Sequence, residues 1–235
     1  MLRCLQICIF IFLALLSCES FAQDIVPESD GDTKYREDQF YIGVTYNLIS
    51  DVPSGVQISG LSGGLQFGYL RDMPINKRRS LAIAVGAGLA FNVYSQLLFI
   101  GEAPDGKTIF TVLDDQNVDF TRNSFNTSTL EVPIEFRWRS STAETYQFWR
   151  IYAGFKIGYA YWYKSTFKQT GNNVTQTDIP EFQKLRLGTS LTFGYNSFNF
   201  IASYSINPFF KDAMTTDGQE VNFRTIQVGI VFYIL

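Results

Sequence analysis

The side chains best placed for chemistry are two glutamates, Glu131 and Glu135, which lie four residues apart. Large apolar residues alternate with them, so both carboxylates are expected on the same side of a predicted strand. A pair of carboxylates on one face could act as a general acid and a general base. The same pair could instead form ion pairs with neighbouring cations inside the folded protein. Six cations are predicted to share the side of the two glutamates: Arg137, Arg139, Arg150, Lys156, Lys184 and Arg186.

Composition excludes most of the remaining catalytic and metal-binding chemistry. The chain contains no histidine, which is the commonest general base and the commonest transition-metal ligand. Its three cysteines, Cys4, Cys8 and Cys18, all lie in a predicted signal peptide, so the mature chain is expected to lack disulfides, thiolate metal sites and cysteine nucleophiles. We therefore expect no enzymatic activity, no cofactor and no metal. The interpretation that we favour is a structural charge network in the interior: Glu131, Glu135, Arg137, Arg150, Lys156 and Arg186.

The N-terminal residues are typical of an export signal. Arg3 precedes an apolar run at residues 5–16, which is too short to span a bilayer comfortably as a helix. Small residues at Ser20 and Ala22 then suit a cleavage site, so the predicted signal peptide is 1–22. Cleavage before a lipid-modified Cys18 is an alternative. Either form of processing takes the protein out of the cytoplasm.

The composition of the 235 residues favours a membrane protein. Hydrophobic residues make up 46% of the chain and aromatic residues 16%, whereas charged residues make up only 17%. A soluble domain usually needs about a quarter charged residues to cover its surface. The net charge of −3 gives no reason to expect a nucleic-acid partner. Residues 23–38 are acidic and without hydrophobic periodicity, which predicts a flexible periplasmic lead-in.

From residue 39 onward the dominant pattern has a period of two, which predicts half-buried strands. One segment, residues 81–98, is long and uncharged enough to suggest a transmembrane helix, but its large residues fall on alternate positions. We therefore expect about eight strands at residues 40–48, 61–71, 81–98, 127–139, 147–165, 182–195, 198–207 and 223–235.

The lengths of the links between these segments alternate. Short links follow the second, fourth and sixth segments, at residues 74–80, 140–146 and 196–197. Long links follow the others, at residues 50–60, 99–126, 166–181 and 208–222. Exported barrels with both ends in the periplasm have short turns inside and long loops outside. The link lengths thus predict this orientation, and leave open whether the 99–126 loop is a docking surface or a lid.

Each predicted strand has one face of large apolar residues and a second, less apolar face. The composition of this second face distinguishes a membrane barrel from a soluble, lipocalin-like barrel. That face consists mainly of Gly, Ala, Ser, Asn and Gln, which suit a narrow interior better than a solvated wall. Aromatic residues near the predicted strand ends are typical of interfacial girdles: Tyr46, Tyr69, Trp138, Tyr163 and Tyr195. We therefore predict an all-β protein at residues 39–235. It is a single antiparallel transmembrane β-barrel of about eight strands with a filled polar interior, in contact with outer-membrane lipid.

Three segments resemble the PorT-type barrels of Bacteroidetes. They read REDQFYIGVTYN at residues 36–47, LEVPIE at 130–135 and GFKIGY at 154–159. The resemblance covers the chain from Tyr35 to its end. Because PorT and its gliding-bacterium counterpart SprT belong to the type IX secretion system, it implies a non-enzymatic outer-membrane barrel that assists protein export and gliding motility. It also implies contacts with other outer-membrane or periplasmic proteins of that system.

Two other functions remain possible from the sequence alone. One is a small outer-membrane pore or ligand-binding barrel of the porin-like type, because period two does not show whether the interior is open. The other is an enzyme that acts on outer-membrane lipid through Glu131 and Glu135. Outer-membrane enzymes of this kind and size generally use a histidine, which the chain lacks.

Overall fold

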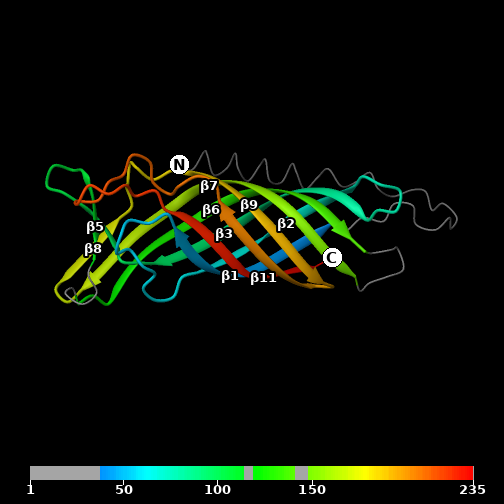
Figure 1. Cartoon of the computed structure of the whole chain (residues 1–235), viewed down its shortest axis with the longest axis horizontal. Coiled ribbons are helices and arrows are strands. Elements are labelled where there is room, and N and C mark those ends of the chain that lie inside the picture. Colours follow the sequence, from blue (N-terminus) through cyan, green and yellow to red (C-terminus); the bar gives the residue numbers. More distant parts are fainter. Residues whose placement is uncertain (1–37, 114–118, 141–147, 235) are drawn as a thin grey trace, which may run out of the picture. The chain divides into compact units, whose positions relative to one another are not determined.

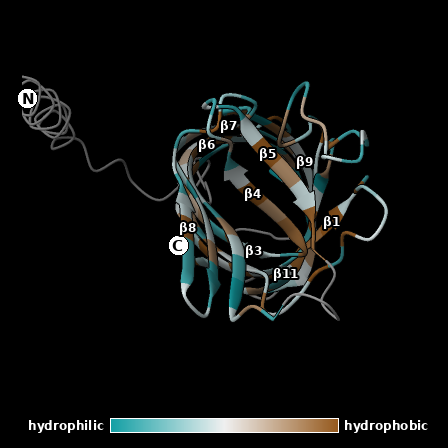
Figure 2. Ribbon diagram, turned by 90° about the vertical axis from the view of Figure 1, so that its left-hand side faces the viewer, coloured by the Kyte–Doolittle hydropathy of each residue, from teal (hydrophilic) through white to brown (hydrophobic). Residues whose placement is uncertain are grey.

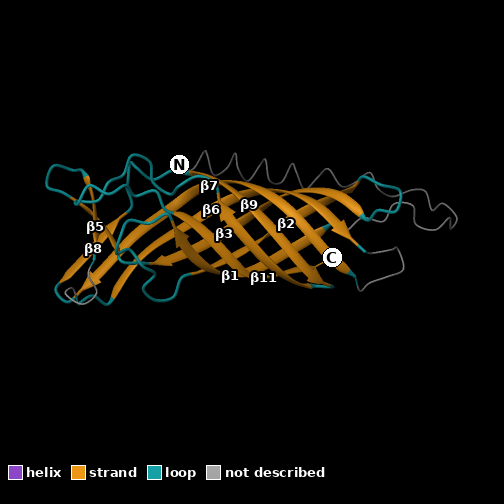
Figure 3. Cartoon of the chain, viewed as in Figure 1, coloured by secondary structure: helices purple, strands orange, loops and turns teal. Residues whose placement is uncertain are grey.

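A computed structural model describes residues 38–113, 119–140 and 148–234. The predicted signal peptide 1–22 and all but the last residue of the predicted lead-in 23–38 lie outside these ranges. The described residues form a ring of eight long antiparallel strands (Figures 1 and 3). The strands of the ring are β1 (Gln39–Ser50), β2 (Gly63–Pro74), β3 (Leu81–Ser95), β6 (Arg122–Arg139), β7 (Trp149–Gln169), β9 (Leu185–Tyr195), β10 (Phe198–Ser205) and β11 (Arg224–Ile234).

The ring closes because its first and last strands pair with each other. β1 lies between β2 and β11, with Phe40 opposite Ile234 at one end and Ser50 opposite Arg224 at the other. The β6–β7 pairing completes the circuit. A closed antiparallel ring leaves no edge in the membrane, so its backbone polar groups are satisfied between strands. No helix within the described ranges is long and apolar enough to cross a membrane.

The outward face of the ring is apolar, as the period-two pattern predicted. Along β6, every second residue of 130–138 is a large apolar side chain that is 38–50% exposed. This stretch of nine residues matches the length at which a tilted strand crosses a bilayer. Trp138, Trp149 and Tyr195 lie at the end of the short turns, whereas Tyr46 and Tyr204 lie toward the long loops. The two groups thus form aromatic belts at the two borders of the apolar band.

The prediction that Tyr163 belongs to an aromatic belt is wrong. Thr129 pairs with Ala160 but Ser128 pairs with Trp162, so Tyr161 is an extra residue in β7. This β-bulge turns Tyr161 and Trp162 both outward and reverses the alternation beyond them. Tyr163 therefore points inward and is only 8% exposed.

The predicted strand limits are wrong mainly at the long-loop end. β6 begins at Arg122 and β7 continues to Gln169, several residues beyond the predicted limits. The predicted strand 81–98 ends at Ser95, and Leu98 begins a separate hairpin. This end contains three additional strands, β4 (Leu98–Glu102), β5 (Thr108–Val112) and β8 (Asn172–Gln176). The outward residues of β6 are polar there, so the sequence carries no apolar alternation to mark the strand.

The long loops are joined by backbone hydrogen bonds into one cap over the ring. Leu97 donates to the carbonyl of Gln57, and Thr216 donates to the carbonyl of Phe110. Figure 2, which views the barrel from this end, shows β4 and β5 running across the ring. Beneath them lies an apolar cluster, here called the aromatic cap: Val56, Tyr94, Leu98, Ile100, Phe110, Phe125, Ala160, Tyr163, Ile179, Phe182, Phe209, Phe210, Ala213, Val221 and Phe223.

Replacing Phe125 with alanine should destabilise the protein by about 3–5 kcal/mol, because it leaves a cavity in the aromatic cap. Phe125 is 1% exposed, and its ring centroid lies 5.3 Å from that of Phe182 and 5.6 Å from that of Phe210. Urea unfolding in lipid vesicles measures the change. Phe200→Ala is the matched control, since this side chain is 59% exposed on the outer face. An equal loss in both variants would contradict a packed cap.

Candidate functional site

A buried cluster of charges fills the barrel near the short turns. The guanidinium of Arg137 lies 3.2 Å from Oδ1 of Asp72, and its Nε donates to Oε2 of Glu135 at 3.0 Å. Arg139 approaches the other oxygen of Asp72 at 2.9 Å. The side chains of Asp72, Arg137 and Arg139 are 0% exposed. One carboxylate thus holds two guanidinium groups in a space closed to water.

Small residues on β3 make this contact possible. β3 lies between β2 and β6, and Ala84 stands between Asp72 and Glu135 in the register. Ala82 and Ala84 are both fully buried. Because these side chains are short, the arginines of β6 can reach over β3 to Asp72 on β2. Larger residues at the two positions would separate the charges.

Aromatic rings complete this layer. The guanidinium carbon of Arg137 lies 4.7 Å from the ring centroid of Tyr152 and 5.7 Å from that of Tyr233. Arg150 lies 4.4 Å from the ring of Phe148 and donates to the carbonyl of Asn196. Guanidinium groups gain electrostatic energy over aromatic faces, particularly when they are desolvated.

The middle of the barrel is polar and also filled. Nζ of Lys156 lies 3.5 Å from Glu131 and donates to Oε1 of Gln66 at 2.8 Å. Nearby, the amide of Gln227 donates to Oδ1 of Asn92 at 2.8 Å and to Oδ1 of Asn47 at 3.0 Å. Amides carry both donors and acceptors, so they satisfy one another without water.

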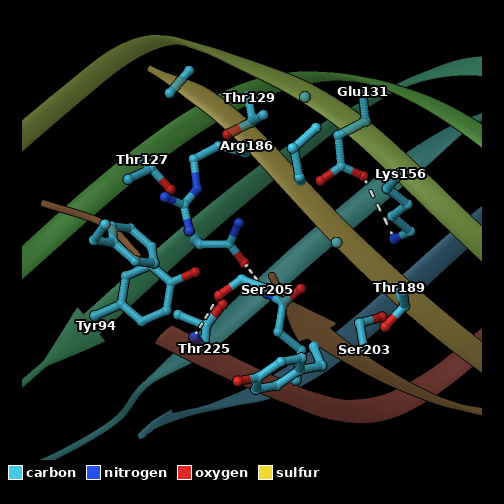
Figure 4. A pocket seen from close by; sticks show the side chains of 18 of the residues that line it. Tyr94, Thr127, Thr129, Glu131, Lys156, Arg186, Thr189, Ser203, Ser205 and Thr225 are labelled. Carbon is cyan, nitrogen blue, oxygen red and sulfur yellow. Dashed lines mark hydrogen bonds and ion pairs between the residues drawn. The ribbon is translucent and has the colours of Figure 1, made fainter. Parts of the chain in front are cut away.

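A cavity of about 60 Å³ remains between the middle layer and the aromatic cap. Figure 4 shows Arg186 with Tyr94 and Thr127 on one side of it, and Glu131 paired with Lys156 on the other. A space of this size holds a few water molecules. Arg186 donates to the carbonyls of Pro208 and Asn207, and its guanidinium lies 4.0 Å from the ring of Phe209. It therefore fixes the last long loop to the barrel wall.

The structure divides the six charges of the predicted network among several places. Glu135 contacts Arg137, and Glu131 contacts Lys156, in two separate layers. Arg150 and Arg186 each donate to backbone carbonyls toward opposite ends of the barrel. Of the other two predicted inward cations, Arg139 is buried but Lys184 is exposed.

Sequence reasoning missed Asp72, the carboxylate at the centre of the buried cluster. The predicted strand ended at Arg71, just before Asp72, whereas β2 continues to Pro74. Asp72 shares the parity of Gln66 and Leu70, which face inward, so extending the alternation by one residue would have found it.

Neither glutamate is arranged for acid–base chemistry. Each contacts a cation, Arg137 or Lys156, and the two lie in different layers. Within the described ranges, no group of three acidic, histidine or cysteine side chains could hold a metal ion. The arrangement is suited to filling and closing the barrel.

Comparison with known proteins gives a family match over most of the chain. Residues 21–212 match the family described as outer membrane protein beta-barrel domain. No curated protein matches the chain.

Two solved structures of Ail from Yersinia pestis are similar at low sequence identity. One is the crystal structure in complex with the heparin analogue sucrose octasulfate. It is 14% identical, with a TM-score of 0.35, and the match covers 85% of this chain and 99% of that chain. The other is the backbone structure in a phospholipid bilayer nanodisc, at 17% identity and a TM-score of 0.31, covering 84% and 100%.

Replacing Asp72 with asparagine should lower the free energy of unfolding by about 3–5 kcal/mol. The nearly isosteric change removes the carboxylate that two buried guanidinium groups share. Asp105→Asn is the control, because the Asp105–Lys107 pair is exposed, with side chains 56% and 82% accessible. An exposed pair contributes less than about 1 kcal/mol. Chemical unfolding of both variants in vesicles measures the difference, and equal stabilities would show that the buried cluster contributes little.

Proposed function

Because the chain belongs to the outer membrane protein beta-barrel domain family, we propose that it acts in the outer membrane as a non-enzymatic barrel that assists type IX protein export. The localisation follows from the family, whereas the role in export rests on the resemblance to PorT-type barrels. That resemblance also supports a contribution to gliding motility. On this proposal, the barrel works by contacting other outer-membrane or periplasmic proteins of the secretion system.

The observation that carries the proposal is the filled interior. At the short-turn end, the side chains of Asp72, Arg137 and Arg139 are inaccessible to water. At the long-loop end, Phe210 and Phe223 are equally inaccessible. A polypeptide could pass through the barrel only by displacing both layers, so the ends and the outer surface remain for contact with partners.

The ion pairing of the glutamates supports a non-enzymatic role. A general acid or base has to reach its substrate, usually through a cleft. Glu135 is only 6% exposed and bound to Arg137. Glu131 borders a cavity that holds only a few waters. Neither carboxylate has room for a lipid substrate beside it.

Deleting the gene in the native host should stop secretion of a type IX cargo protein, and the wild-type gene should restore it. Two double variants with reversed charges then test which end of the barrel contacts other proteins of the secretion system. Lys77→Glu with Arg78→Glu changes a short turn, and Asp217→Lys with Glu220→Lys changes the loop end. At least one pair should reduce secretion at unchanged barrel levels. Normal secretion in the deletion strain would refute the proposed role.

Purified protein in planar lipid bilayers should show no steady conductance. The fully buried charge cluster and the aromatic cap leave ions no hydrated path along these side chains. Phe210→Ala with Phe223→Ala, which thins only the cap, should also stay closed because the charge cluster is intact. A stable open current from the wild-type barrel would favour the alternative function of a small pore.

A further inference from the structure

β6 and β7 continue beyond the aromatic belt at the long-loop end, and the outward side of this extension is cationic. Its charged residues are Arg122 on β6 with Lys164 and Lys168 on β7. Below the bulge the outward residues of the two strands are apolar, whereas above it they are these cations with serine, threonine and asparagine. The change of chemistry marks the point where the wall leaves the hydrocarbon.

The register places like charges directly opposite each other. Arg122 pairs with Lys168 across the two strands, and Lys164 lies opposite Asn126. Like charges at directly opposed positions destabilise a sheet unless something neutralises them. Nε of Arg122 donates to Oγ of Ser124 at 3.0 Å, and this partner is neutral, so it does not offset the charge of the guanidinium. Across the described part of the chain, none of these three cations forms an ion pair with a carboxylate.

The cations begin immediately above the aromatic belt. Tyr161 and Trp162, the two residues of the bulge, face outward with exposed fractions of 52% and 44%. With a rise of about 3.3 Å per residue and a strand tilt of about 40°, Lys164 stands roughly 5 Å above Trp162 and Lys168 roughly 15 Å above it. The polar headgroup layer of a phospholipid bilayer is only about 5–8 Å thick on each side. A larger headgroup is needed to reach all three cations.

We propose that Arg122, Lys164 and Lys168 form a surface that binds the phosphate groups of an outer-leaflet glycolipid. Long loops of exported barrels face outward, so the extension lies beside the outer leaflet. The acyl chains of such a lipid would contact the apolar wall, and Tyr161 and Trp162 would lie at its interface. Its phosphorylated sugars would reach Lys164 first and the Arg122–Lys168 pair next. Asn173 of β8, opposite Lys168, adds an amide donor at the same level. This surface does not depend on the proposed role in export.

The probe for this surface is rough-type lipopolysaccharide, used with its phosphates present or enzymatically removed. The folded barrel in neutral detergent should bind the phosphorylated form at least tenfold more tightly, as measured by native mass spectrometry. The triple variant Arg122→Gln, Lys164→Gln, Lys168→Gln should bind it roughly 100-fold more weakly than the wild type, since each surface cation contributes about fivefold.

A matched triple variant at the other end tests whether the effect is local. Arg71→Gln, Lys77→Gln, Arg78→Gln removes three exposed cations near the short turns and should change the affinity less than threefold. Heat-modifiable migration on gels confirms that each variant is folded. Equal affinity for the phosphorylated and dephosphorylated lipids would overturn the proposal. So would equal weakening in both triple variants, which indicates general charge attraction, or equally tight binding of phosphatidylglycerol, which indicates an ordinary phospholipid.

Discussion

The structure depends on the requirement that no backbone polar group be left unpaired in a bilayer. An antiparallel sheet meets it only by closing on itself, which β1 and β11 do along eleven residue pairs. A ring of eight strands encloses a space just wide enough for side chains. The interior therefore has to be filled by the chain's own residues, and charges placed there have to find partners among themselves. The Asp72 cluster and the amides of Asn47, Asn92 and Gln227 both follow from this constraint.

Residue size determines where the interior groups can meet. Ala82 and Ala84 leave space for the arginines of β6 to reach Asp72. Gly88 leaves space for Tyr41, because a Cβ atom there would lie only 2.0 Å from the tyrosine hydroxyl. Above the membrane, apolar packing replaces polar pairing, since three of the long connections bring phenylalanines together, at Phe110, at Phe182 and at residues 209–223. Polar pairing thus closes one end of the barrel and apolar packing closes the other.

The fold could be predicted from the sequence because the bilayer imposes its own pattern. Lipid on one side and a narrow interior on the other produce strict alternation, as in Phe40, Ile42 and Val44. The prediction failed outside the bilayer and at the bulge, where nothing imposes this alternation on the sequence. Beyond the membrane the outward residues of β6 are polar, and the single extra residue at Tyr161 has no local signature. The buried cluster was only partly predictable, because the Asp72–Arg137 contact depends on a register between β2, β3 and β6 that one strand does not reveal.

In this account the interior side chains fill and stabilise the barrel, and the proposed contacts with partners and lipid lie at its ends and on its outer surface. The claim that the interior is closed is tested most directly by thiol accessibility, because the chain contains no cysteine after Cys18. Thr192 is 1% exposed inside the barrel, whereas Ser54 is exposed on a long loop. A small methanethiosulfonate reagent should label Ser54→Cys in the folded protein and label Thr192→Cys only after unfolding. Comparable labelling of both cysteines in the folded protein would contradict the account.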